Sequence, residues 1–222
     1  MASAAGRRII PPRREGPAPV TTGPETYHGL GLTHGMWGVV IFIASEVMFF
    51  AALFTVYFYL RAQHPDWAPP GGQRPGAFPF RGELREIVPT INTIFLVSSS
   101  FTMQFGVNAL KRGDHRRFVR LLGATIVLGA IFMIGQFGIE YPKLIGENLV
   151  PQSGLFGAVF FTLTGFHGAH VTGGVIFMGI VLLRALAGQF TAHRHLAVEA
   201  ASIYWHFVDV VWIGLYSTIY IL

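Results

Sequence analysis

Five long apolar segments occupy most of this sequence, and each is long enough to cross a membrane as a helix. They lie at about residues 36–60, 87–110, 118–141, 155–183 and 198–222. An α-helix rises about 1.5 Å per residue, so about 20 residues cross a hydrocarbon core that is roughly 30 Å thick. Of the 222 residues, 52% are hydrophobic and 12% are charged, which is too apolar for a soluble domain. The sequence therefore predicts an all-α, polytopic membrane protein, a bundle of five transmembrane helices.

Charged residues outside these segments predict the domain organisation and the orientation in the membrane. Residues 1–33 are basic, rich in proline and without the apolar run of a signal peptide, so we expect an N-terminal tail followed by one domain at 34–222. This tail and the links after the second and fourth segments share one side and carry most of the lysines and arginines. The positive-inside rule then places the N-terminus in the cytoplasm and the C-terminus outside. It also accounts for the net charge of +5, so we expect no nucleic-acid partner.

The last segment carries one polar stripe on an otherwise apolar helix. Its members recur at steps of three and four residues and so share one side of a helix with 3.6 residues per turn. They are Glu199, Ser202, His206 and Asp209. A charged residue at the membrane centre costs about 2.5 to 3.5 kcal/mol on an insertion scale and usually faces protein or water. We therefore expect this stripe to face other helices.

Ionisable residues on three segments lie at similar depths in the membrane. With the orientation above, Glu46, His206 and Asp209 lie about 12 to 16 Å from the cytoplasmic end of their segments, and His167 and His170 about 20 to 24 Å. We expect these five residues to form one buried polar cluster that joins the first, fourth and fifth helices. Apolar neighbours favour the neutral form of Glu46 unless a histidine supplies a cation. Two roles stay open for this acid, a structural hydrogen bond between helices and proton exchange.

A metal site is the alternative for these histidines, because imidazole ligates haem and copper and because His167 and His170 are spaced i, i+3. However, Asp209 gives His206 a partner one turn away, and the five segments contain no further histidine. We therefore favour a polar cluster and expect no metal or other cofactor in this chain. The absence of cysteine excludes disulfides, thiolate ligands and iron–sulfur clusters.

Polar residues of the second and third segments predict packing and surface contacts. The hydroxyl and amide side chains of the second segment predict hydrogen bonds between helices. Gln136 and Glu140 are spaced i, i+4 near the external end of the third segment. We interpret them as an interfacial cap, or as a contact with lipid headgroups or with a loop of a partner.

Three motifs on separate segments carry a resemblance to a known family. They are SEVMFF at residues 45–50, TGFHGAHV at 164–171 and YWHFVDVVW at 204–212. In this order they resemble subunit III of haem-copper oxidases, in the five-helix form that occurs in bacteria, and residues 136–141 also fit the family. The resemblance covers about residues 36–222, and three motifs in a fixed order make it specific.

The resemblance implies a non-redox accessory subunit of a proton-pumping, aa3-type cytochrome c oxidase in the aerobic respiratory chain. It implies subunits I and II as partners, with haem a and copper held by those partners, bound phospholipids and a bacterial inner (plasma) membrane. Membership of a respiratory supercomplex stays open. The resemblance also implies support for proton uptake and for the stability of the catalytic subunit I. Glu46 corresponds to a reactive buried carboxylate of the family. The mitochondrial form has two further helices that form a lipid-filled cleft, and this chain has no segments for them.

Other functions stay open at this point. Subunit III of a quinol oxidase and the accessory subunit of nitric oxide reductase are related proteins, although Glu46 after Ser45 resembles the cytochrome c branch. An independent proton transporter would use the same acids in the membrane. A di-haem electron carrier would use the histidines instead.

Overall fold

Helices make up nearly all of the structure, a computed structural model that describes residues 33–64, 84–192 and 194–221. The elements are α1 (His34–Gln63), α2 (Leu84–Lys111), α3 (His115–Met133), η1 (Ile134–Glu140), α4 (Tyr141–Gly146), α5 (Leu155–Leu186), α6 (Leu196–Tyr216) and η2 (Ser217–Ile221). The segments η1 and η2 are π-helical, and the first joins α3 to α4 without a break while the second extends α6. The chain therefore forms five long rods, which confirms the all-α prediction. The predicted tail and the linker at 65–79 lie outside the described residues.

Four of the five rods are long and apolar enough to cross a membrane, by length and composition. They are His34–Gln63, His115–Gly146, Leu155–Leu186 and Leu196–Ile221. The rod α2 is long enough but does not belong to this set, because threonine, serine, asparagine and glutamine recur along it. The structure accounts for these polar residues through the contacts of α2 with its neighbours.

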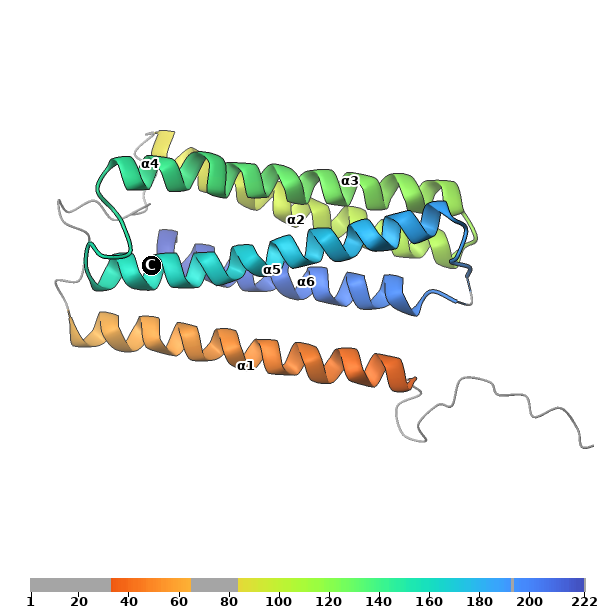
Figure 1. The fold of residues 1–222 in the computed structure, drawn as a ribbon, viewed down its shortest axis with the longest axis horizontal. Helices are drawn as coiled ribbons and strands as arrows, with labels where there is room; N and C mark the ends of the chain where they lie inside the picture. The colour runs from red at the N-terminus through yellow and green to blue at the C-terminus, as the bar shows by residue number, and fades with distance from the viewer. Residues whose placement is uncertain (1–32, 65–83, 193, 222) are drawn as a thin grey trace, which may run out of the picture. The chain divides into compact units, whose positions relative to one another are not determined.

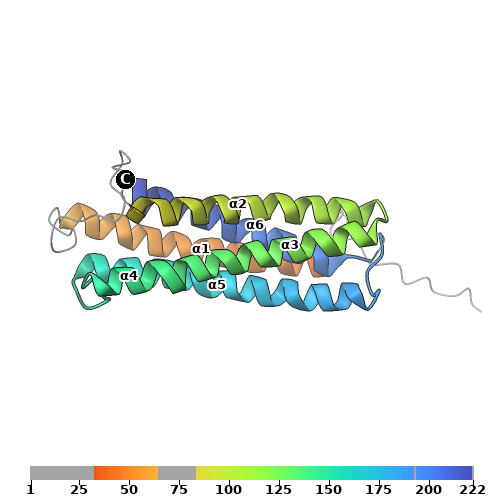
Figure 2. The same cartoon turned by 90° about the horizontal axis from the view of Figure 1, so that it is seen from above.

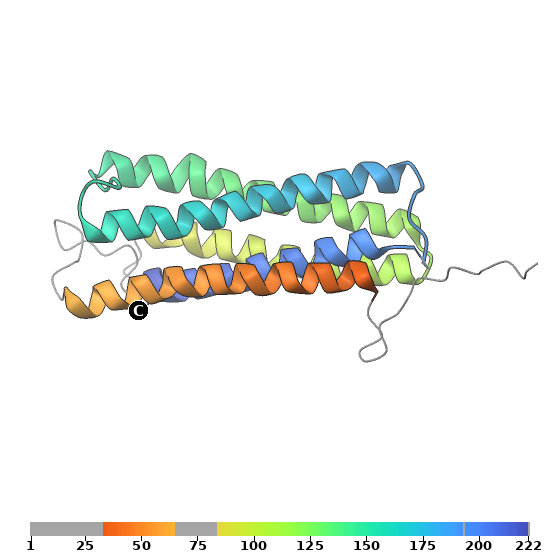
Figure 3. The ribbon, with the colours of Figure 1, turned by 60° about the horizontal axis from the view of Figure 1, so that its bottom comes forward.

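The rods lie alongside one another, as Figure 1 and Figure 2 show. The rods α2 and α3 are adjacent and are joined by the short basic link that the sequence indicates. Asp114 caps the start of α3 by accepting a hydrogen bond from the backbone N–H of Arg117 at 3.0 Å. Figure 3 shows α1 running along the α5 and α6 side of the bundle.

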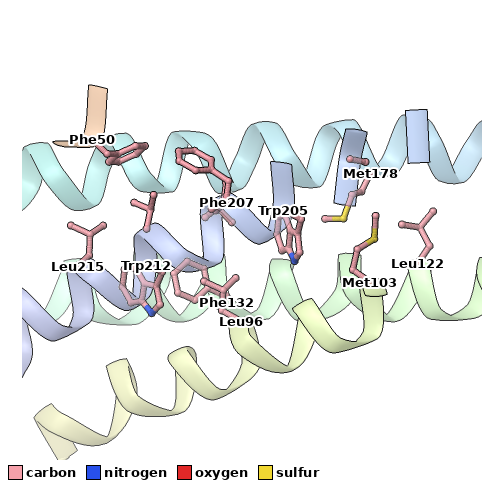
Figure 4. Packing of buried hydrophobic residues seen from close by; sticks show 14 of the residues in the cluster. Phe50, Leu96, Met103, Leu122, Phe132, Met178, Trp205, Phe207, Trp212 and Leu215 are labelled. Atoms are coloured by element: carbon pink, nitrogen blue, oxygen red, sulfur yellow. The ribbon is translucent and has the colours of Figure 1, made fainter. Parts of the chain in front are cut away.

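Two tryptophans of α6 occupy the centre of the bundle (Figure 4), and both are fully buried. Gly129 of α3 and Gly174 of α5 lie so close to Trp205 that a Cβ added at either would come within 2.8 and 2.9 Å of the ring. Trp212 meets Phe132 of α3 edge to face, with ring centroids 4.7 Å apart. Glycine at these two positions therefore makes room for an indole between three helices.

Hydrogen bonds join α2 to α6 along most of their length, and we call this contact the α2–α6 seam. The indole N–H of Trp205 donates to Ser99 at 2.8 Å, and that of Trp212 donates to Thr93 at 2.9 Å. At the far end, Lys111 pairs with Glu199 at 2.7 Å. The prediction that polar residues of the second segment bond between helices is thus confirmed. Because their partners lie on another helix, these polar groups avoid contact with lipid.

The rod α1 contacts the rest of the bundle through few side chains. Its buried residues are Met36, Phe50 and Tyr57, and the Tyr57 hydroxyl donates to the carbonyl of Thr218 at 2.8 Å. Large apolar side chains of α1 are exposed, among them Ile41, Phe42, Val47, Met48 and Tyr59. This exposed surface is suited to acyl chains or to an apolar protein surface.

Candidate functional site

The SEVMFF motif of α1 and the TGFHGAHV motif of α5 meet at one contact. The Oε2 atom of Glu46 lies 2.8 Å from Nε2 of His170, and both side chains are about four-fifths buried, with 21% and 17% of their surface exposed. The other ring nitrogen, Nδ1, lies 2.7 Å from the carbonyl oxygen of Phe166 and must donate to it. The Nε2 contact therefore needs a second proton, carried by the ring or by the carboxyl group.

Aromatic side chains surround this pair. The rings of Phe50 and Phe49 lie with centroids 4.9 and 6.2 Å from that of His170. The hydroxyl of Tyr204, on α6, donates to the backbone carbonyl of His170 at 3.0 Å. The surroundings are apolar apart from this hydroxyl group, so the acid and the imidazole are each other's main polar partner.

His206 and Asp209 lie elsewhere, on the α2 side of α6. The hydroxyl of Ser100 lies 2.9 Å from Nδ1 of His206 and also donates to Oδ2 of Asp209. The Nε2 atom of His206 lies 3.3 Å from the amide oxygen of Gln104. Asp209 is buried, whereas Gln104 is exposed on the outer face of α2. The sequence reasoning missed Ser100 and Gln104 as members of this site, although both belong to the polar run of α2.

His167 occupies a third place, inside the bundle between α3, α5 and α6. Only 1% of its surface is exposed. Its ring lies 5.0 Å from that of Trp212 and 6.0 Å from that of Phe132, and neither ring nitrogen has a hydrogen-bond partner among the described residues. Although His170 follows it by less than one turn, the two rings face different neighbours.

The structure therefore does not bring the five ionisable residues into the single cluster expected from their depths, and that expectation was wrong. Glu46 and His170 join α1 to α5, whereas His206 and Asp209 join α6 to α2. The reason is that the polar stripe of α6 faces the hydroxyl groups of α2, while α1 meets α6 through aromatic contacts such as Phe50 with Phe207. Residues at a similar depth in the membrane can lie on different faces of their helices, so depth alone did not predict which side chains meet.

Of the remaining members of the α6 stripe, Glu199 contacts α2. Glu199 accepts from Lys111, at the end of α2, and lies 3.2 Å from Nε2 of His195. Ser202 is buried one turn further along α6, with 5% of its surface exposed. The Glu199–Lys111 pair extends the α2–α6 seam and fastens the start of α6 to the end of α2.

Gln136 and Glu140 are buried inside the bundle, with 1% and 3% of their surface exposed. The interpretation as an interfacial cap or a headgroup contact is therefore wrong. Both belong to η1, where the wider π-helical turn changes the direction of the side chains. They lie near the buried hydroxyl of Tyr220 in η2. The sequence gives no signal for this π-helical turn.

No three histidine, aspartate or glutamate side chains come close enough to hold a metal ion within the part of the chain that the structure describes. The separation of His167, His170 and His206 onto different faces explains why they do not form a common ligand set. The donors that do meet, a carboxyl group with one imidazole, suit hydrogen bonding and proton exchange.

Comparisons with known proteins match nearly the whole chain. The sequence profile of the family described as Cytochrome c oxidase subunit III matches residues 21–222. A protein of Nocardia farcinica named "Probable cytochrome c oxidase subunit 3" is 44% identical over 184 residues, which cover 82% of this chain and 85% of the relative. The "Cytochrome c oxidase subunit 3" of Corynebacterium diphtheriae is 44% identical over 183 residues, covering 82% and 85%. That of Synechocystis is 40% identical over 188 residues, covering 84% and 75%.

Proposed function

Because the chain belongs to the cytochrome c oxidase subunit III family, we propose that it is a non-redox accessory subunit of a proton-pumping, aa3-type cytochrome c oxidase. Subunits I and II are its partners in a bacterial plasma membrane, and they hold the haem a and copper that reduce dioxygen. The basic N-terminal side faces the cytoplasm. Relatives named cytochrome c oxidase subunit 3 favour cytochrome c over a quinol as the electron donor of the complex.

The Glu46–His170 contact is the observation that supports an auxiliary role in proton uptake. Glu46 lies twelve residues after the start of α1, or about 18 Å along the helix, which is well inside the hydrocarbon layer. A carboxyl group and an imidazole that share a proton at this depth give the subunit a proton-exchanging pair without a redox centre. The pair also fastens α1 to α5, so it serves the stability of the subunit at the same time.

The outer face of α2 next to α6 is suited to docking on subunit I. The amide of Gln104 is exposed there, and its Nε2 lies 3.3 Å from the side-chain oxygen of Asn108. The side chains of Phe101 and Phe105 are 60% and 56% exposed beside it. Acyl chains offer no hydrogen-bonding groups, whereas a neighbouring transmembrane helix offers polar side chains and a close-packed apolar surface. A catalytic subunit thus satisfies this face better than lipid does.

The exposed apolar side of α1 is a separate surface. It carries large apolar side chains, such as Met48, which is 74% exposed. Phospholipid acyl chains are the occupant that matches this composition.

Purification of the tagged chain from its native membrane in a mild detergent tests the proposal. Subunits I and II should co-purify with the absorption spectrum of a-type haem. A coloured, redox-active chain without those subunits would indicate an electron carrier instead. Proton transport by the chain alone in liposomes would indicate an independent transporter, and a subunit II without a copper-binding cysteine motif would indicate a quinol oxidase.

A further inference from the structure

A second polar chain crosses from the buried side of α6 to the outer face of α2. It begins at Asp209, continues through Ser100 and His206, and ends at the exposed amide of Gln104. The hydrogen-bond contacts are continuous: Ser100 Oγ with Asp209 Oδ2, Ser100 Oγ with His206 Nδ1 at 2.9 Å, and His206 Nε2 with Gln104 Oε1 at 3.3 Å. This series of polar contacts shares no residue with the Glu46–His170 pair.

The number of available protons limits how Asp209, Ser100 and His206 can be hydrogen-bonded to one another. Ser100 has one hydroxyl proton and two neighbours that both need a hydrogen bond from it or to it. If Ser100 donates to the carboxylate of Asp209, the serine oxygen must accept from Nδ1–H of His206. If Ser100 instead donates to Nδ1, its oxygen must accept from a protonated Asp209. Because Nε2 of His206 must also carry a proton to donate to the amide oxygen of Gln104, each arrangement requires one further proton, either on the acid or on Nδ1 of the ring.

The environment of Asp209 favours keeping that proton within the pair. The side chain is 4% exposed, and its second oxygen, Oδ1, has no hydrogen-bond partner among the described residues. Within the same residues no lysine or arginine forms an ion pair with it; Lys111 pairs with Glu199 at the end of the seam. A carboxylate without a cation is costly at this depth, so the imidazole behind Ser100 is the available source of its proton or of its counter-charge.

We propose that Asp209, Ser100 and His206 form a proton-sharing relay that holds one proton between the acid and the imidazole. In the transfer step the O–H bond of Asp209 breaks and its proton joins the oxygen of Ser100. At the same time the original hydroxyl proton of Ser100 leaves for Nδ1 of His206. A neutral acid and a neutral imidazole thereby become a carboxylate and an imidazolium, with no proton gained or lost. This goes beyond the proposed function, because it assigns proton exchange to the α2–α6 side.

The position of Gln104 gives the relay an outlet. With the ring protonated at both nitrogens, Nε2–H donates to the amide oxygen of Gln104, which lies on the exposed face of α2. At the other end of the relay, Asp209 is buried, with 4% of its surface exposed. Proton exchange with the surroundings therefore proceeds from the His206 end.

Infrared spectroscopy of the purified complex tests the relay. The band of a protonated carboxyl group that disappears in Asp209→Asn is assigned to Asp209, and the imidazole band that disappears in His206→Gln is assigned to His206. If the proton is shared equally, His206→Gln raises the protonated population of Asp209 about twofold, because glutamine cannot take the proton. In Asp209→Asn, the imidazolium signal of His206 is lost.

Ser100→Ala and its control Ser100→Thr both keep the two titratable groups. Comparing them separates the loss of proton sharing from a general effect on folding. Alanine removes the hydroxyl group, so replacing His206 should no longer change the carboxyl band of Asp209. Threonine keeps the hydroxyl group and should preserve the wild-type response. The proposal is overturned if His206→Gln changes the Asp209 band as much in the Ser100→Ala background as in the wild type. It is equally overturned if His206→Gln leaves that band unchanged, or if Asp209 shows no protonated population in the wild type.

Discussion

The Nε2 atom of His170 lies 2.8 Å from Oε2 of Glu46, a contact between residues 124 positions apart that joins α5 to α1. A second contact between α1 and the rest of the bundle is the hydrogen bond from the Tyr57 hydroxyl group to the carbonyl of Thr218. We expect Glu46→Ala to destabilise the attachment of α1 by about 1 to 2 kcal/mol, because His170 loses its partner in an apolar setting. Glu46→Gln should cost less than half of this, since its amide can donate to Nε2. Denaturant unfolding in detergent measures both.

The same two variants separate structure from proton exchange. Glu46→Gln keeps a hydrogen bond but cannot release a proton, so in the assembled oxidase we expect slower proton uptake and faster inactivation during turnover. Stopped-flow measurements with a pH dye and the decay of oxygen consumption report these quantities. Wild-type values for both would leave Glu46 with a packing role alone.

The sandwich of Trp205 between two glycines predicts a contrast between adjacent positions on α5. A Cβ at Gly174 would lie 2.9 Å from the indole ring, whereas the nearest atom to a Cβ at Gly173 is the Tyr204 hydroxyl at 3.6 Å, an ordinary contact. We expect Gly174→Ala to destabilise the bundle by about 1 to 3 kcal/mol and Gly173→Ala to be nearly neutral. Thermal unfolding followed by tryptophan fluorescence compares the two. Equal effects would mean that Trp205 does not lie against Gly174.

The α2–α6 seam predicts a cost for removing single hydroxyl groups. Thr93→Val keeps the shape of the side chain but leaves the indole N–H of Trp212 without its acceptor, so we expect a loss of about 1 to 2 kcal/mol. Thr162→Val is the control, because the hydroxyl of Thr162 is exposed and, among the described residues, bonds only to the carbonyl of Ala158 on its own helix. The control should change the free energy of unfolding by less than about 0.5 kcal/mol. A loss of similar size in both variants would argue against the seam.

The absence of cysteine allows single-cysteine labelling to test the orientation. Arg116→Cys lies in an exposed position in the first turn of α3, and Gly146→Cys lies in an exposed position at the end of α4. In intact spheroplasts a membrane-impermeant maleimide should label Gly146→Cys, while Arg116→Cys should react only after permeabilisation. The opposite pattern would reverse the proposed topology.

The apolar segments of the sequence predicted the five helices well. They could not predict which side of each helix faces which neighbour. Apolar runs long enough to span a membrane gave all five helices, because length and hydropathy are local properties. The partners of Asp209 and His206 depend on how α6 is rotated against α2, which is decided by the fit of Trp205 and Trp212 between neighbouring helices. The π-helical turn that buries Gln136 and Glu140 likewise depends on tertiary contacts.

Photo-cross-linking from α2 tests the central claim, that this chain is an accessory subunit and that the outer face of α2 next to α6 docks on subunit I. A benzoylphenylalanine introduced at Phe105, beside Gln104, replaces an exposed ring by a similar one, and the same substitution at Phe58 on the exposed side of α1 is the control. The account predicts a cross-linked product with subunit I from position 105 and mainly lipid adducts from position 58. Lipid adducts alone at position 105, in membranes that contain the assembled oxidase, would contradict it.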